Sequence, residues 1–259
     1  MERALTVAID AAQAAAREIR AIWDQQDAWV IDKDGGKGPL TQADLAADKI
    51  IQDHLRTAFP DDGLLSEETT DNPQRLAKRR VWIIDPVDGT REFVDRVPEF
   101  VVSIGLVVEG EARLGVLVNP ITGEVMTGVV GDGATYNGEP ARVTRQGQLD
   151  GSRVVVSRSE VKKGWFERWR DQVDFQPVGS VAYKLGLVGT GRADATFTPK
   201  PRNEWDLCAG AAIIVAGGGR ATDGSDVPYR FNRPDPLHRG VVGTNGGLHP
   251  AIMGLLGQL

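Results

Sequence analysis

The sequence is poor in cysteine and contains no long apolar run. Cys208 is the one cysteine in 259 residues, so no disulfide can form within the chain, and this favours a reducing compartment. The longest apolar stretches, such as 101–108, are far too short to cross a bilayer. The charged, alanine-rich start at Met1 lacks an apolar signal core. These absences predict a cytoplasmic protein with no membrane partner.

Positive charge is also in deficit. Lysine and arginine number 30 against 36 aspartates and glutamates, which gives a formal net charge of −6. Proteins that bind the phosphate backbone usually carry a basic excess, so nucleic acid is not expected as a partner. An acidic protein can still bind a small phosphate if it recruits cations. Only three histidines are present, His54, His238 and His249, and we interpret them as surface or core residues rather than ligands.

Hydrophobic periodicity predicts two helices at the start of the chain. Apolar residues recur at spacings of four and three from Leu5 to Trp23, which is typical of an amphipathic helix. After a break rich in glycine and lysine at 34–39, a second helix is expected to open at Thr41. Asp44, three residues later, is close to a capping-box pattern, and the turn residues of 59–63 would end this helix.

The hydrophobic pattern of the rest of the chain predicts a series of strands and then alternating strands and helices. Strands are predicted at 81–84, 100–108, 114–119, 125–130, 154–157, 193–197 and near 241. Helices are predicted from about 159, at 180–188, at 205–216 and from 249. An antiparallel sheet flanked by helices, followed by an α/β half, predicts alternating layers of helix and sheet.

The segment 82–90 carries the most chemical information. An apolar strand is expected to end at Asp85, where Pro86 turns the chain and brings Asp88 to the same side. Two converging carboxylates repel each other unless a cation lies between them, and Mg²⁺ prefers such oxygen ligands. Gly89 allows close backbone approach, and a helix from Thr90 would direct free N–H groups at a phosphate. The alternative is an ordinary Asp-Pro-x-Asp-Gly turn.

Three other acidic positions have ordinary explanations when each is taken alone. Paired glutamates such as those at 67–68 usually lie on a solvated surface, and this would account for Glu67. Asp44 and Asp206 are explained as carboxylates in the first turn of a helix, where the helix dipole favours them. Their occurrence in order with Asp85 and Asp88 favours one shared site.

The acidic segments together resemble the inositol monophosphatase superfamily of lithium-sensitive, Mg²⁺-dependent phosphatases. The matching segments are 40–44, 66–68, 82–90 and 205–210, with 216–218 behind, and the resemblance spans roughly residues 5–255. It implies a layered α-β-α-β-α sandwich. We expect an N-terminal α+β subdomain at 1–140 with the metal-binding motifs, and a C-terminal α/β subdomain at 141–259 that completes the active site. Ser66 stands where many relatives have glycine, and its small size should make it tolerated.

Within the superfamily the chain looks most like the 3′(2′),5′-bisphosphate nucleotidases of the CysQ type. The residues that carry this likeness are 91–93, 179–185 with 191–194, and 230–234. The likeness implies hydrolysis of 3′-phosphoadenosine 5′-phosphate, a by-product of sulfate assimilation, to AMP and phosphate. An inositol monophosphatase, a fructose-1,6-bisphosphatase and a catalytically inactive sensor of nucleotide phosphates remain alternatives. Homodimers are common in the superfamily.

The resemblance also implies roles for individual residues. Glu67, Asp85 and the carbonyl of Val87 would hold one Mg²⁺, and Asp85, Asp88 and Asp206 a second; a weaker third ion near Glu67 would accompany substrate. Asp44 would act as the general base through the Thr90 hydroxyl, and Glu67 could share that role. Substrate would contact Asp88, Gly89, Thr90, Gly179, Ser180, Lys184 and Asp206. For Lys184 a solvated surface position is the alternative.

Overall fold

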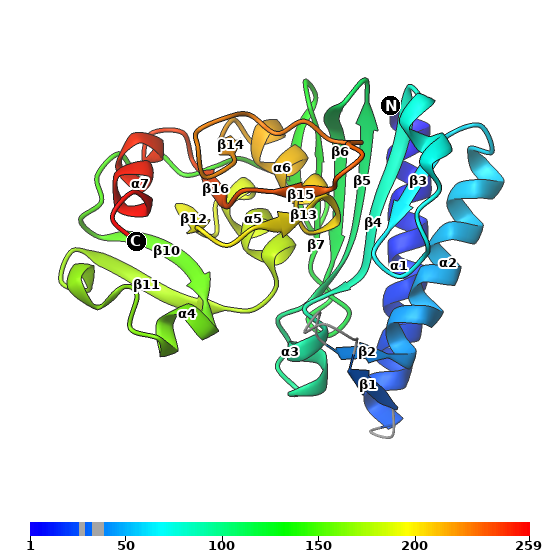
Figure 1. Ribbon diagram of the computed structural model, residues 1–259, viewed down its shortest axis with the longest axis horizontal. Coiled ribbons are helices and arrows are strands. Elements are labelled where there is room, and N and C mark those ends of the chain that lie inside the picture. The colour runs from blue at the N-terminus through cyan, green and yellow to red at the C-terminus, as the bar shows by residue number, and fades with distance from the viewer. Residues whose placement is uncertain (26–28, 33–38) are drawn as a thin grey trace.

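The computed structural model describes residues 1–25, 29–32 and 39–259, and these form five alternating layers of helix and sheet (Figure 1). From one side to the other, the layers are two long helices, a seven-stranded sheet, two helices, a five-stranded sheet and an outer helical layer. The predicted layered fold is therefore confirmed. None of the helices in the described ranges is both long and apolar enough to cross a membrane.

The first layer consists of α1 (Glu2–Gln25) and α2 (Gln42–Ala58), as the periodicity predicts. α1 buries a stripe of alanines that ends in Ile19, Ile22 and Trp23, so the helix packs closely on its neighbours. At the start of α2, Thr41 and Asp44 form the predicted capping box. Residues 34–38 of the predicted break between the helices lie outside the described residues.

The second layer is a mostly antiparallel sheet in which strand order follows the chain. Its strands are β3 (Gly63–Ser66), β4 (Arg80–Asp88), β5 (Val101–Val108), β6 (Glu111–Val118), β7 (Val125–Val129), β8 (Gly133–Tyr136) and β9 (Glu139–Ala141), and only β3 and β4 run parallel. Alternate residues face opposite layers: Trp82 and Ile84 join the core under α1 and α2, whereas Val81 and Ile83 join the core on the other face. A small pair, β1 (Val30–Asp32) and β2 (Pro39–Thr41), lies beside this sheet.

The prediction that a strand ends at Asp85 is wrong, because β4 continues to Asp88. Asp85 pairs with Ser103 and Asp88 pairs with Val101, and the register shifts between the two pairs. Pro86 lies in this irregular stretch, where a residue without an N–H group costs the sheet no hydrogen bond. The irregularity still brings Asp85 and Asp88 to one site, although through a bulge instead of a turn.

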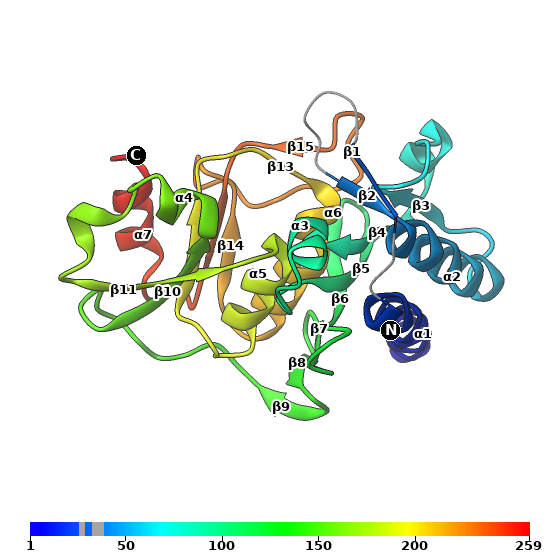
Figure 2. The same ribbon diagram turned by 90° about the horizontal axis from the view of Figure 1, so that it is seen from below.

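The second half supplies the remaining layers (Figure 2). The five-stranded sheet has the order β11 (Val173–Val178), β10 (Ser152–Ser157), β12 (Ala195–Thr198), β16 (Val241–Thr244) and β14 (Arg220–Thr222), with β11, β10 and β12 parallel. The other elements are α3 (Thr90–Val94), α4 (Arg158–Lys162), α5 (Val181–Gly189), α6 (Glu204–Ala216), α7 (His249–Leu256), the pair β13 (Arg202–Asn203) and β15 (Leu237–His238), and the 3₁₀ turns Pro73–Ala77 and Glu167–Trp169. The subdomain boundary near residue 140 stays a prediction, because α6 from the second half packs directly on the sheet of the first.

Three glycines let α6 lie almost backbone to backbone on the seven-stranded sheet. A Cβ atom at Gly115 would lie 2.1 Å from the carbonyl oxygen of Ala209. A Cβ atom at Gly105 would lie 2.4 Å from the sulfur of Cys208, and one at Gly128 would lie 2.6 Å from the Cα of Ile213. Cys208 is fully buried there, and burial raises the pKa of its thiol well above the usual value, which suits a structural residue.

We expect Gly115→Ala to destabilise the protein, because the added methyl group must displace the backbone of α6. Overpacking of this kind costs about 1–3 kcal/mol of unfolding free energy. Gly254→Ala, on α7, is the matched control: its new Cβ would meet nothing within 4 Å and should be neutral or slightly stabilising. Urea denaturation of both variants checks this. Equal stability of the two would contradict the close approach of α6.

Candidate active site

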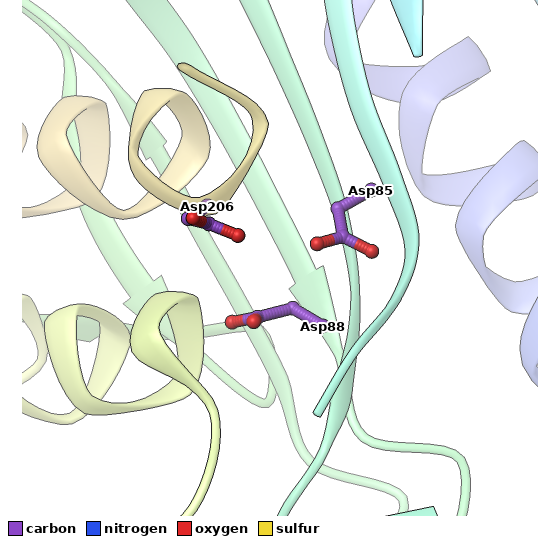
Figure 3. A group of neighbouring side chains, drawn as sticks. All are labelled: Asp85, Asp88 and Asp206. Atoms are coloured by element: carbon purple, nitrogen blue, oxygen red, sulfur yellow. The ribbon is translucent and has the colours of Figure 1, made fainter. Parts of the chain in front are cut away.

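Three aspartates from distant parts of the chain converge where β4 meets the start of α6 (Figure 3). Asp85 and Asp88 come from the irregular end of β4, and Asp206 comes from the first turn of α6. One carboxylate oxygen from each lies within 4.8 Å of the other two. Asp85 and Asp88 are buried, whereas Asp206 is partly exposed. The three carboxylates therefore form one cluster with one side open to solvent.

Burial and mutual repulsion make this cluster unfavourable as three bare anions. Burial first, and then the charges of Glu67 and Asp88, raise the pKa of Asp85 well above its usual range. Burial also raises the pKa of Asp88, although hydrogen bonds from the Ser180 hydroxyl and the Ala182 amide partly offset this. The pKa of Asp206 is raised by burial and then by Asp88 and Glu67. A positive charge within the cluster would relieve all three effects.

The donor set fits a divalent cation with oxygen ligands. Within 1–25, 29–32 and 39–259, no lysine or arginine forms an ion pair with Asp85, Asp88 or Asp206. Carboxylates with no cationic side chain between them are the ligands that Mg²⁺ takes, together with waters and substrate phosphate. Val87, whose carbonyl is a further predicted ligand, lines the same pocket.

Glu67 reaches the cluster from the end of β3. It lines the pocket, and its negative charge contributes to the raised pKa values of Asp85 and Asp206. The preceding Ser66 is buried, and its hydroxyl donates to Asp48 at 2.5 Å and accepts from the Glu68 amide at 3.2 Å. Serine at this position therefore fits, and its hydrogen bonds fix the turn that carries Glu67.

The structure also brings Asp44 and Thr90 together, as predicted. The Thr90 hydroxyl lies 3.1 Å from an Asp44 carboxylate oxygen and 3.1 Å from the carbonyl oxygen of Val87. Asp44 is 1% exposed, and burial raises its pKa even though hydrogen bonds from Thr41 act in the opposite direction. Thr90 begins α3, and Gly89 before it has a φ of 107°, which favours glycine.

The predicted substrate residues Gly179, Ser180 and Lys184 lie at the start of α5 and line the same pocket. The Ser180 hydroxyl donates a hydrogen bond to the Asp88 carboxylate, and the Gly179 amide donates to the Glu99 carboxylate at 2.7 Å. Lys184 is only 6% exposed, so the surface alternative for this residue is wrong. Its ammonium donates to the backbone carbonyls of residues 178–180, and burial lowers its pKa to about 8.

The pocket has a volume of 580 Å³, which is in the range of small-molecule sites. Every predicted site residue lines it except Asp44, which lies behind Thr90. The three histidines do not line it, as expected. Sequence reasoning missed several of its polar side chains: Arg91, Glu92, Asp95, Arg158, Lys162, Lys200 and Arg202. The side chains within 158–162 and 200–202 follow β10 and β12. Ligands often bind at the carboxyl ends of parallel strands, so the positions just after these strands could have indicated the residues from the sequence.

Comparison with known proteins agrees with this geometry. The model of the inositol monophosphatase family matches residues 1–259. Inositol monophosphatase 2 of Solanum lycopersicum is 32% identical over 270 residues, covering 100% of this chain and 99% of that protein. The fructose-1,6-bisphosphatase/inositol-1-monophosphatase of Thermotoga maritima is 31% identical over 233 residues, covering 88% of this chain and 86% of its own length.

Solved structures agree as well. The structure of a Thermotoga maritima inositol monophosphatase superposes with a TM-score of 0.87 at 30% identity, covering 100% of this chain and 98% of that one. The match over the whole chain, the layered fold and the aspartate cluster lead to one conclusion: this protein belongs to the inositol monophosphatase family.

Proposed function

We propose that this protein is a Mg²⁺-dependent phosphomonoesterase that hydrolyses a small phosphorylated substrate. The observation that carries the proposal is the cluster of Asp85, Asp88 and Asp206 in the lining of a pocket. When bound, Mg²⁺ would neutralise these carboxylates, polarise the phosphate and lower the pKa of the attacking water. We assign Glu67, Asp85, Val87, Asp88 and Asp206 as its ligands, with two ions expected and a weaker third with substrate.

The remaining chemistry falls to positioning and proton transfer by the chain itself. The Thr90 hydroxyl can accept a hydrogen bond from the attacking water while it donates to Asp44 at 3.1 Å. A proton can therefore move from water to the Thr90 oxygen as the Thr90 proton moves to Asp44. The raised pKa of Asp44 makes it a better base than an ordinary aspartate. The amides of Gly89 and Thr90 would bind the phosphate at the start of α3.

For the substrate we propose a bisphosphate, with 3′-phosphoadenosine 5′-phosphate as the first compound to test. The segments 91–93 and 179–185 support this, since both contribute to the pocket and both resemble the bisphosphate nucleotidases. Inositol 1-phosphate is the second candidate, supported by the names of the relatives in tomato and Thermotoga maritima. The same Thermotoga protein is named for fructose 1,6-bisphosphate as well.

We expect Asp88→Asn and Asp206→Asn each to reduce turnover on the order of 10³-fold, because a lost charge weakens cation binding and transition-state stabilisation by several kcal/mol. Phosphate release at saturating Mg²⁺ measures this. Asp53→Asn is the control, since Asp53 is a surface residue of α2 paired with Lys49. Near-normal kcat in either cluster variant would refute the ligand assignment.

The cluster should also make stability depend on pH when no cation is present. Burial and like charges raise the folded-state pKa of Asp206 from 3.8 to about 8. Between these values the folded state binds more protons than the unfolded state, so stability is lost as pH rises through this window. In EDTA, Asp206→Asn should therefore gain stability relative to the natural protein as pH rises from about 4 to 8.

Thermal unfolding in EDTA and in Mg²⁺ at several pH values tests this. Mg²⁺ should raise the Tm of the natural protein, and more so at higher pH, because deprotonated carboxylates bind the cation. The Tm of Asp206→Asn should respond less. A Tm that is indifferent to Mg²⁺ at pH 8 would count against a cation site.

A substrate panel separates the candidates for the reaction. We expect kcat/KM for 3′-phosphoadenosine 5′-phosphate to exceed that for inositol 1-phosphate, and EDTA to abolish both activities. Phosphate release from these two compounds and from fructose 1,6-bisphosphate is the measurement. A preference for inositol 1-phosphate would keep the mechanism and replace the substrate. No release from any of them would favour an inactive sensor.

A further inference from the structure

The lining of the pocket carries groups of both signs. The aspartate cluster and Glu67 are its acidic group, where the scissile phosphate would bind with Mg²⁺. Lys162, Lys200 and Arg202 belong to the second half and also line the pocket, and we call these three residues the cationic wall. A volume of 580 Å³ leaves room for more than one phosphate and its cations. A second anionic group of the substrate can therefore contact the cationic wall while the scissile phosphate lies at the aspartate cluster.

The cationic wall lies at the carboxyl ends of neighbouring parallel strands. Lys162 ends α4, which follows β10 directly, and Lys200 and Arg202 follow β12. β10 and β12 pair in parallel, so the carboxyl ends of both strands lie at the same edge of the sheet. In open α/β sheets this edge is where ligands bind. The three cations thus lie at the usual ligand-binding edge of the second sheet.

Lys200 is held in place by a buried carboxylate. Glu160 is 0% exposed and accepts from the Thr198 hydroxyl at 2.7 Å, and the Lys200 ammonium lies 3.3 Å from the same oxygen. The second oxygen of Glu160 is buried and has no hydrogen-bond partner among the residues that the structure describes. The segments 158–162 and 198–202 are therefore joined beneath the pocket, and Lys200 is fixed at its surface.

Arg202 and Lys162 have no carboxylate partner within the described parts of the chain. The Arg202 guanidinium donates to the backbone carbonyl of Pro201 at 3.0 Å, and its positive charge acts on both Asp206 and Lys184. This contrasts with Arg158 in the same pocket, which is neutralised by Glu99. Unneutralised cations in a pocket attract an anion, and the arginine fork matches a phosphate in particular.

We propose that Lys162, Lys200 and Arg202 form a second anion subsite, which binds a phosphate group of the substrate other than the one that is hydrolysed. This inference rests on the proposed phosphomonoesterase function, because it assumes that the scissile phosphate lies at the aspartate cluster. It deepens the proposed bisphosphate specificity by assigning the residues that would make a compound with two phosphate groups bind better than the same compound with one.

Two pairs of compounds isolate the second phosphate. Adenosine 3′,5′-bisphosphate and adenosine 3′-monophosphate differ only in the 5′-phosphate, and fructose 1,6-bisphosphate and fructose 1-phosphate differ only in the 6-phosphate. Dissociation constants are measured by calorimetry with Mg²⁺ in an Asp44→Asn background, which the proposed mechanism predicts to be inactive. We expect the bisphosphate of at least one pair to bind tenfold or more tightly than its monophosphate.

The subsite residues are then removed. Arg202→Ala and Lys162→Ala should each lower this preference at least threefold, and the double variant should abolish it. Lys163→Ala is the matched control, since Lys163 neighbours Lys162 but lies outside the pocket lining. Lys162 is exposed, so its loss should not affect folding, and the Tm of each variant verifies this.

The outcomes separate the subsite from the reaction. Equal affinity within both pairs, a preference that survives the double variant, or an equal loss in Lys163→Ala would overturn the subsite. Phosphate release by the natural protein is measured with the same four compounds. No release from any of them would overturn the phosphomonoesterase while leaving the binding comparison valid. Release without a preference would overturn the subsite alone.

Discussion

Repulsion among buried carboxylates is the constraint on which the rest of this structure depends. The fold distributes this repulsion over the starts of three helices. Asp206 lies in the first turn of α6, Asp88 accepts from the Ala182 amide in the first turn of α5, and Asp44 closes the capping box of α2. Helix N-termini stabilise negative charge, so each carboxylate has a local partner. Within the described residues, however, no lysine or arginine forms an ion pair with Asp85, Asp88 or Asp206, and such a carboxylate set favours a cation of high charge and small size.

The convergence of the aspartates requires that α6 lie unusually close to the seven-stranded sheet. Asp206 belongs to the helix, whereas Asp85 and Asp88 belong to the sheet, and they share a site only because two packed layers meet at that point. Gly105 and Gly115 allow this approach, since a side chain at either position would overlap the helix. These glycines do not line the pocket, yet they set the distance between the two halves of the proposed cation site. The packing of α6 on the sheet therefore determines the geometry of the site.

The sequence predicts what is local and leaves out what depends on tertiary contacts. Periodicity and the capping pattern correctly predict α1 and α2, and the family resemblance carried by the acidic segments implies which residues meet. The predicted end of β4 was wrong because Pro86 is compatible both with a turn that ends a strand and with a bulge inside a strand. The burial of Lys184 was missed because a lysine in a short helix usually lies in solvent. The cationic wall was missed because its residues lie about forty positions apart, in segments that follow β10 and β12, and no local pattern predicts that these two strands pair.

The stretch 230–234 shows why motifs of this family say more about the cation than about the substrate. It resembles the bisphosphate nucleotidases, yet none of its residues lines the pocket. The amides of Asn232 and Arg233 donate to the buried carboxylate of Glu204, two residues before Asp206, at 2.7 and 2.9 Å. The stretch therefore braces the start of α6 and with it Asp206, which we propose as a cation ligand. Residues with such a role would serve any phosphomonoester equally, so discrimination between substrates would have to come from the side chains that line the pocket.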